Sequence, residues 1–408
     1  MELSNRIQKI MSNPSAILEG HLICHSDPYS IDNPNGYLNF GIAENHLMDD
    51  MLLPYLNKEN HLEKEDLQYF DLSGHPQLRK SCKLFFEKYF NFKIENPDNF
   101  VITNGLSTAC ECLSYSLFND GDYLMIPTPY YTGFEFDFQK RFNVNFLNVH
   151  LESKNNFYHD IKLFKESYES FSDKSKIKAI LLTHPHNPTG EVLSKEFLTD
   201  IIAFAKEKKL EIITDEIYAL TRMDNGKHNS LMKIGKDYDE HIHFMYGLAK
   251  DFTLAGFKVG IFYSKNEKLV NAMKTLSYFH CVSSLTQKSS AKLLSDFEFI
   301  DLYLEENNKR LRETKNLIIS SLPELKYIDG DSGLFFLVDF RKFLKEQSFE
   351  EERKLWRTLI HDYKISLSCG QDMGINEAGF FRLCFSKSKD SVNELIKRLK
   401  VILSKQSL

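Results

Sequence analysis

Hydrophobic residues gather in short runs between about residues 99 and 264, and longer amphipathic stretches separate several of these runs. The runs are continuous rather than alternating, which is typical of strands buried on both faces of a parallel sheet. They predict strands over 99–103, 123–127, 144–149, 177–183, 210–214, 241–247 and 258–264. The amphipathic stretches predict helices over 107–118, 131–142 and 194–209. This alternation predicts a mostly parallel, doubly wound sheet with helices on both faces.

The pattern changes after about residue 285. A long amphipathic helix, an apolar stretch, a further helix and a strand-like stretch are predicted over 297–321, 333–340, near 348–362 and over 380–386. This arrangement predicts a second, smaller α+β unit. We therefore expect an α/β fold with a large domain over 51–290 and a small domain that combines 1–50 with 291–408.

The composition is that of an ordinary globular chain, with 42% hydrophobic and 26% charged residues among 408. The net charge of −6 argues against binding to nucleic acid or to an anionic membrane. Seven scattered cysteines form no C-x-x-C pair, so they predict neither a disulfide framework nor a metal site. There is no apolar run of about 18 residues, and the polar segment 1–15 does not resemble a signal peptide. These features predict a cytoplasmic protein without a membrane span.

Three candidate catalytic residues follow predicted strands. Lys250 comes after strand 241–247, and a lysine with a lowered pKa is a Schiff-base nucleophile, although a solvated surface lysine is the alternative. Asp215 follows strand 210–214, where sheet enzymes place ligand-binding side chains, and a carboxylate there could keep a pyridine nitrogen protonated. The alternative for Asp215 is a helix cap. Tyr218 is three residues further on and could hydrogen-bond a ring hydroxyl.

Further polar and aromatic residues occupy similar positions. In THPHNPTGEVLS (183–194), Asn187 can donate to a ring oxygen, although Asn-Pro is also a common turn. The segment ITNGLSTACE leads from a strand into a helix that begins with Leu106, Ser107 and Thr108. Such a helix start either binds an anion or is an ordinary cap. In PTPYYTGF, Tyr131 could stack on a pyridine ring or belong to the core.

The order of these motifs resembles that of the fold-type I pyridoxal phosphate (PLP) enzymes, the class I/II aminotransferase superfamily. Within it, the chain resembles the 1-aminocyclopropane-1-carboxylate (ACC) synthases. The resemblance extends from about Asn33 to about Phe385, and its segments are NPNGYLNFGIAENHL, HPHNPTG, TDEIY, LAKDFTLAGFKVG and FFRLCF. It implies PLP as the cofactor and a homodimer with active sites at the interface.

The resemblance also implies roles around the cofactor. Lys250 is expected to carry PLP as a Schiff base and to shuttle a proton. Asp215 is expected to pair with the pyridine nitrogen, and Tyr218 and Asn187 with the ring oxygen. Tyr131 is expected to stack on the ring.

For the substrate, the resemblance implies that Arg382 binds the α-carboxylate through two parallel hydrogen bonds, which suits arginine better than lysine. Ala43 is expected at the substrate edge. Glu44 matches a glutamate that is near the amino-acid substrate in ACC synthases.

Three positions depart from the family pattern at the phosphate. Lys258 stands where arginine is usual, Gly247 where a hydroxyl residue is common, and Leu72 near the place of a tyrosine donated by the partner subunit. Lys258 still offers a positive charge, and Ser107 and Thr108 remain, so we expect PLP to bind.

The resemblance leaves three functions open. The first is an ACC-synthase-like lyase that deprotonates Cα of the external aldimine and eliminates or replaces a γ substituent on an S-adenosylmethionine-type substrate. The second is an aminotransferase of amino-acid metabolism with a 2-oxo acid acceptor. The third is a non-catalytic binding protein with the fold of a PLP enzyme. Fold alone does not decide among them.

Overall fold

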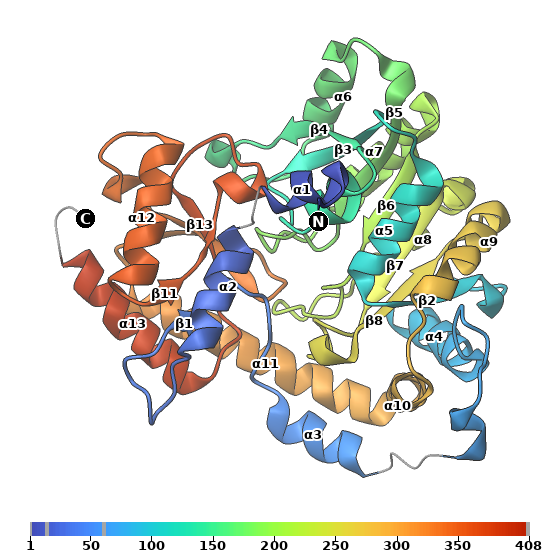
Figure 1. The fold of residues 1–408 in the computed structure, drawn as a ribbon, viewed down its shortest axis with the longest axis horizontal. Helices are drawn as coiled ribbons and strands as arrows, with labels where there is room; N and C mark the ends of the chain where they lie inside the picture. The colour runs from blue at the N-terminus through green and yellow to red at the C-terminus, as the bar shows by residue number, and fades with distance from the viewer. Residues whose placement is uncertain (1, 13–15, 59–62, 405–408) are drawn as a thin grey trace.

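The computed structural model describes residues 2–12, 16–58 and 63–404, and it contains a seven-stranded sheet between two layers of helices (Figure 1). The strand order is β2-β8-β7-β6-β5-β3-β4, over Phe100–Asn104, Val259–Tyr263, Ile242–Gly247, Glu211–Asp215, Ile177–Thr183, Tyr123–Thr128 and Asn145–His150. Strand β8 runs antiparallel to both neighbours, and the other pairings are parallel. This confirms the predicted α/β class with a mostly parallel sheet.

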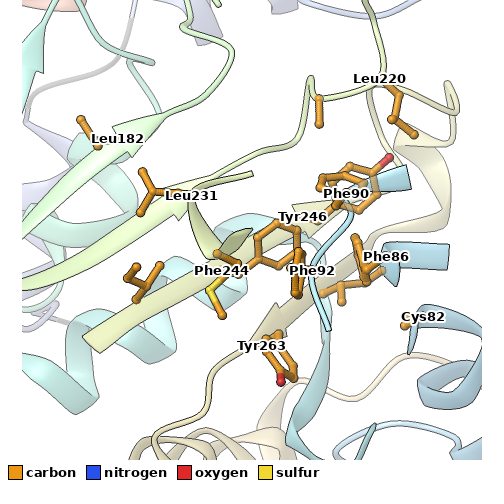
Figure 2. Packing of buried hydrophobic residues seen from close by; sticks show 14 of the residues in the cluster. Cys82, Phe86, Phe90, Phe92, Leu182, Leu220, Leu231, Phe244, Tyr246 and Tyr263 are labelled. Atoms are coloured by element: carbon orange, nitrogen blue, oxygen red, sulfur yellow. The ribbon is translucent and has the colours of Figure 1, made fainter. Parts of the chain in front are cut away.

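Successive residues of each strand pack into different cores because side chains alternate across a sheet. In β2, Phe100 and Ile102 join one cluster while Val101 joins the opposite one. Figure 2 shows the first cluster, where Phe86 and Phe90 of the α4 region pack against Phe244 and Tyr246 of β7. The strands are therefore buried on both faces, as continuous apolar runs predict.

Helices cover both faces of the sheet. The first cluster takes residues from α4, α6, α7, α8 and α10, over Pro76–Tyr89, Ile161–Ser170, Lys195–Lys208, Leu231–Ile234 and Ser284–Ser295. The opposite face is covered by α5 (Leu106–Leu117), α9 (Glu267–Leu276) and a π-helical segment (Glu135–Lys140). The helix predicted over 131–142 is thus wrong in extent. Thr132 and Gly133 instead form a turn before the helical residues begin at Phe134, and a Cβ on Gly133 would collide with the ring of Tyr131.

A smaller unit is built around a four-stranded antiparallel sheet. Its order is β12-β13-β10-β9, over Ser368–Cys369, Phe380–Cys384, Phe335–Asp339 and Lys326–Ile328. A short parallel pair, β1 (Leu38–Asn39) with β11 (Ile365–Ser366), brings the N-terminal region to this unit. Its helices are α2, α12 and α13, over Ala16–Ser26, Phe349–His361 and Lys389–Leu403. Two further helices, α1 (Asn5–Met11) and α3 (Asp49–Asn57), lie elsewhere along the N-terminal segment.

Helix α11 (Phe297–Ser321) joins the two units. Its first half contributes Ile300 and Tyr303 to the core of the large sheet, and its second half contributes Leu311 and Ile318 to the core of the small unit. The division at residues 50 and 290 therefore stays a prediction, because a continuous helix crosses from one core to the other. Across the described residues, every helix is too short or too polar to span a membrane.

Candidate active site

A cavity of about 180 Å³ lies at the carboxyl ends of the central parallel strands and at the start of α5. We call it the central cavity. Of the nine predicted cofactor residues, eight line it: Leu106, Ser107, Tyr131, Asn187, Asp215, Tyr218, Lys250 and Lys258. The ninth, Thr108, is not a lining residue, and its hydroxyl donates to the carbonyl of Asn104 at 2.9 Å. The fold thus gathers residues that are up to 152 positions apart in the chain.

Lys250 follows β7 and points its amine toward the N-terminal segment. Its Nζ donates a hydrogen bond to the carbonyl oxygen of Ala43 at 2.5 Å. Burial lowers the pKa of Lys250 to about 8, and the positive charge of Arg382 acts in the same direction. A lysine with this pKa reaches its neutral, nucleophilic form far more easily than a solvated lysine.

Asp215 ends β6 and has a buried carboxylate. Its Oδ1 accepts a hydrogen bond from the backbone N–H of Ile217 at 3.1 Å. Burial raises the pKa of Asp215 to about 7, and no cationic side chain in the described parts of the chain forms an ion pair with it. A protonated ring nitrogen is the kind of partner that such a carboxylate needs.

Two aromatic residues and an amide lie near Asp215. Tyr218 is buried and packs edge-on against Phe335, with ring centroids 5.1 Å apart. Tyr131 keeps 36% of its surface exposed, so its ring is free to cover a flat ligand. Asn187 is buried at the end of β5. We call the part of the cavity formed by Asp215, Tyr218 and Asn187 the sheet end.

The opposite part, which we call the helix end, is formed by Gly105, Ser107 and Lys258. Gly105 has a φ of 84° and directly precedes α5, which leaves the first N–H groups of that helix available to an anion. A Cβ on Gly105 would lie 3.1 Å from the Nζ of Lys258, so the ammonium group lies against the start of the helix. A lysine beside a helix N-terminus suits a phosphate.

Gly247 and Leu72 are the other two residues that depart from the family pattern at the phosphate, and they lie in different places. Gly247 lines the central cavity, and a Cβ there would be 3.1 Å from the carbonyl oxygen of Val259. Leu72 is half-buried in the loop before α4 and does not line the cavity of its own chain. Its predicted place near the partner's phosphate stays a prediction.

The sequence analysis missed Asp137, which also lines the helix end. It belongs to the π-helical segment, where burial raises its pKa to about 7 while a hydrogen bond from Ser107 and the charge of Lys258 oppose that change. An amphipathic pattern placed Asp137 on a polar helix face, and nothing in the sequence indicated that a π-helix would turn it inward. The helix end therefore holds one acid as well as one lysine.

Arg382 lies on β13 of the small unit and reaches the large one. Its Nη1 donates to Oδ1 of Asn187 at 2.9 Å, and its Nη2 donates to the carbonyl of Gly41 at 2.8 Å. Arg382 is 2% exposed, and its Nε has no hydrogen-bond partner in the described part of the chain. A buried guanidinium with an unpaired donor, next to a side-chain amide, suits a carboxylate ligand.

Ala43 and Glu44 lie on the segment that covers Lys250, but neither lines the central cavity. Ala43 accepts the hydrogen bond of Lys250 through its carbonyl. Glu44 Oε2 is 3.5 Å from Nε2 of His46, and this contact lowers the pKa of Glu44 to about 2. The negative charge of Glu44 also acts on Lys250 and raises its pKa.

Comparison with known proteins identifies the class to which this fold and cavity belong. The family model "Aminotransferase class I and II" matches residues 36–399, so the chain belongs to this family. The family uses PLP. Among solved structures, Pyrococcus protein A1 matches with a TM-score of 0.84 at 20% identity, covering 99% of each chain. An aspartate aminotransferase double mutant of Thermus thermophilus matches with a TM-score of 0.81 at 19% identity, covering 98% of this chain and 100% of that one.

The curated relatives that the chain matches include ACC synthases of plants. ACC synthase 2 of Solanum lycopersicum is 33% identical over 401 residues, which cover 93% of this chain and 83% of that protein. ACC synthase 11 of Arabidopsis thaliana is 35% identical over 381 residues, which cover 89% and 83%. The similarity to ACC synthases therefore extends over most of the chain.

Proposed function

We propose that this protein is a PLP-dependent enzyme that acts on an α-amino acid, with Lys250 as the residue that binds the cofactor covalently. The observation that carries the proposal is the meeting of Lys250, Asp215, Tyr218 and Asn187 in one cavity. When bound, PLP supplies an electron sink for a carbanion at Cα of the amino acid.

Each residue of the central cavity would bind a different part of the cofactor, according to its position. Asp215 would hold the proton on the ring nitrogen, and Tyr218 and Asn187 would bind the ring oxygen. Lys258, Ser107 and the first N–H groups of α5 would hold the phosphate. Tyr131 would cover the ring face. These six residues fit PLP because they supply a counter-charge or donor for each of its polar groups.

The substrate would be fixed by the small unit. Arg382 would bind the α-carboxylate, sharing it with Asn187 through the contact that already joins the two side chains. Lys250, with its lowered pKa, would then take the proton from Cα and hold it at Nζ. The carbonyl of Ala43 accepts from the same Nζ and would orient it.

For the reaction itself we propose ACC-synthase-like elimination or replacement of a γ substituent, on a substrate of the S-adenosylmethionine type. The 33–35% identity to named ACC synthases over most of the chain supports it, as does the acidic Glu44 beside the lysine. Transamination with a 2-oxo acid is the second candidate, because it needs the same residues up to loss of the Cα proton. We also propose a homodimer, in which the loop that carries Leu72 reaches the partner.

One experiment separates the two reactions. The protein loaded with PLP is incubated with S-adenosylmethionine, and separately with an amino acid mixture and 2-oxoglutarate, and the products are identified by mass. ACC or another γ-elimination product in the first reaction supports the lyase. Glutamate in the second reaction alone would assign an aminotransferase. Light scattering on the same sample tests the dimer, and a monomer that retains PLP would contradict it.

A further inference from the structure

A second pocket, of about 250 Å³, lies in the small unit between α2, β1 and the start of α13. Figure 1 shows these three elements side by side, away from the large sheet. We call it the lateral pocket. It shares no lining residue with the central cavity. Of its lining residues, only Glu44 has a part in the proposed reaction.

Lys387 is the feature of this pocket that needs an explanation. The residue is only 4% exposed, and it lines the lateral pocket. Within the described ranges, no carboxylate forms an ion pair with its ammonium group and no oxygen accepts a hydrogen bond from it. Burial of an ammonium ion without a contacting counter-charge is strongly unfavourable. The charge of Glu44 acts on Lys387 without forming an ion pair with it, so a counter-charge at short range would have to come from a ligand.

The other polar groups of the lateral pocket also favour a negative ligand. His21 and His25 lie one turn apart on α2, with ring centroids 6.1 Å apart, and His46 also lines the pocket. Ser391 belongs to the first turn of α13, whose N-terminus carries a partial positive charge. Glu44 is the one acid among the lining residues, and it already contacts His46 at 3.5 Å.

The remaining walls are aromatic. Tyr29, Tyr37 and Phe40 line the lateral pocket beside the polar groups. An inorganic anion would leave these surfaces without a partner, whereas an organic acid would cover them and remove apolar area from water. The presence of Glu44 also disfavours a ligand with two or more negative charges.

We propose that the lateral pocket binds a small organic carboxylate, and that the carboxylate group pairs with Lys387. The proposal does not depend on which reaction takes place in the central cavity, and Glu44 belongs both to this pocket and to the proposed substrate side. It assigns to the small unit a ligand site that is separate from the carboxylate site at Arg382.

The test is calorimetric titration of the full-length protein with propionate. The sample carries PLP, and aminooxyacetate blocks the central cavity as an oxime of the cofactor, so that binding at Arg382 does not contribute. Its unbound excess is removed before the titration, because aminooxyacetate is itself a small organic carboxylate. We expect one propionate site in the unchanged protein. Lys387→Met should weaken it at least tenfold, whereas Lys387→Arg should retain it. Lys389→Met is the matched control, since Lys389 is exposed and only two positions away, and it should bind as the unchanged protein does.

Three results would overturn the proposal: no propionate binding to the unchanged protein, equal binding to the Lys387→Met variant, or binding of inorganic phosphate in place of propionate. If Lys387→Met does not fold, a crystal structure of the unchanged protein with propionate decides the matter. A carboxylate oxygen within hydrogen-bond distance of Lys387 Nζ supports the site. Propionate bound elsewhere, with the lateral pocket free of it, contradicts it.

Discussion

The sheet end and the helix end of the central cavity hold charge in different ways. At the sheet end, Asp215 is the last residue of β6 and is held by the ladder of the sheet, and Asn187 is a buried side chain in the loop after β5. At the helix end, much of the binding capacity belongs to backbone N–H groups, supplemented by Lys258 on a flexible side chain. We infer that the sheet end controls the reaction, and that the helix end controls how tightly the cofactor is held. Substitutions at the two ends should separate these effects.

The largest effect is expected at Asp215. Asp215→Asn keeps the shape of the side chain but removes the charge that would hold a proton on the ring nitrogen. A preorganised electrostatic group of this kind is worth about 100- to 1000-fold in kcat. We therefore expect a loss of that size, while PLP affinity changes by less than about tenfold. Activity assays measure kcat, and cofactor titration by absorbance measures PLP affinity. If PLP affinity falls as much as kcat does, the inference that the sheet end controls the reaction rather than cofactor binding is wrong.

Arg382→Lys should give the next largest effect. Lysine keeps the charge but loses the fork of donors that now reaches Asn187 and Gly41. A buried, hydrogen-bonded charge pair is worth about 2–5 kcal/mol, so amino-acid affinity should fall about 30-fold or more. Cofactor affinity serves as the internal control and should stay the same. Unchanged affinity for the amino acid would rule out this role for Arg382.

A smaller effect is expected at the helix end. Lys258→Ala should weaken PLP binding about tenfold, because a hydrogen bond to a charged group contributes about 1.5–3 kcal/mol and the helix N-terminus remains. Lys258→Arg should restore or improve affinity, since arginine binds phosphate through two donors. Lys268→Ala, an exposed substitution on α9, is the surface control. If Lys258→Ala binds PLP normally, the backbone alone holds the phosphate.

The smallest effect concerns the titration of Lys250 in protein without cofactor. Only the neutral amine reacts with acetic anhydride, so labelling of Lys250 should rise with pH and level off above its pKa. The pKa of about 8 predicts a midpoint near pH 8, whereas an ordinary lysine has its midpoint near 10.4. Competitive labelling followed by peptide mass analysis measures this, and a midpoint near 10 would show that burial does not act on this amine.

Much of the fold could be predicted because continuous apolar runs report burial on both faces. Strand 177–183 and helix 297–321 have the bounds that the sequence predicts, and Ser194 caps α7 by accepting from the N–H of Phe197. The helix predicted over 131–142 is shorter in the structure, because a turn at Thr132 and Gly133, beside the ring of Tyr131, precedes it. Helices such as α4 and α10, which pack on each other, were absent from the prediction.

The sheet end could also be predicted, because Asp215 lies at the end of a buried strand and Tyr218 and Asn187 lie in the loops just after buried strands. Asp137 could not, since its inward direction comes from a π-helix. The contact between Arg382 and Asn187 joins residues 195 positions apart. Lys387 gave no signal at all, because a single lysine in a polar segment is ordinarily a surface residue. These features depend on tertiary packing, which a pattern along the chain does not report.

The central claim is that Lys250 binds the cofactor covalently, and borohydride reduction tests it most directly. The protein is loaded with PLP, reduced, digested and mapped by mass, with Lys250→Ala as the control. We predict a phosphopyridoxyl group on Lys250 in the unchanged protein and no specific label in the variant. A label at another lysine, or equal labelling of the Lys250→Ala variant, would contradict the account.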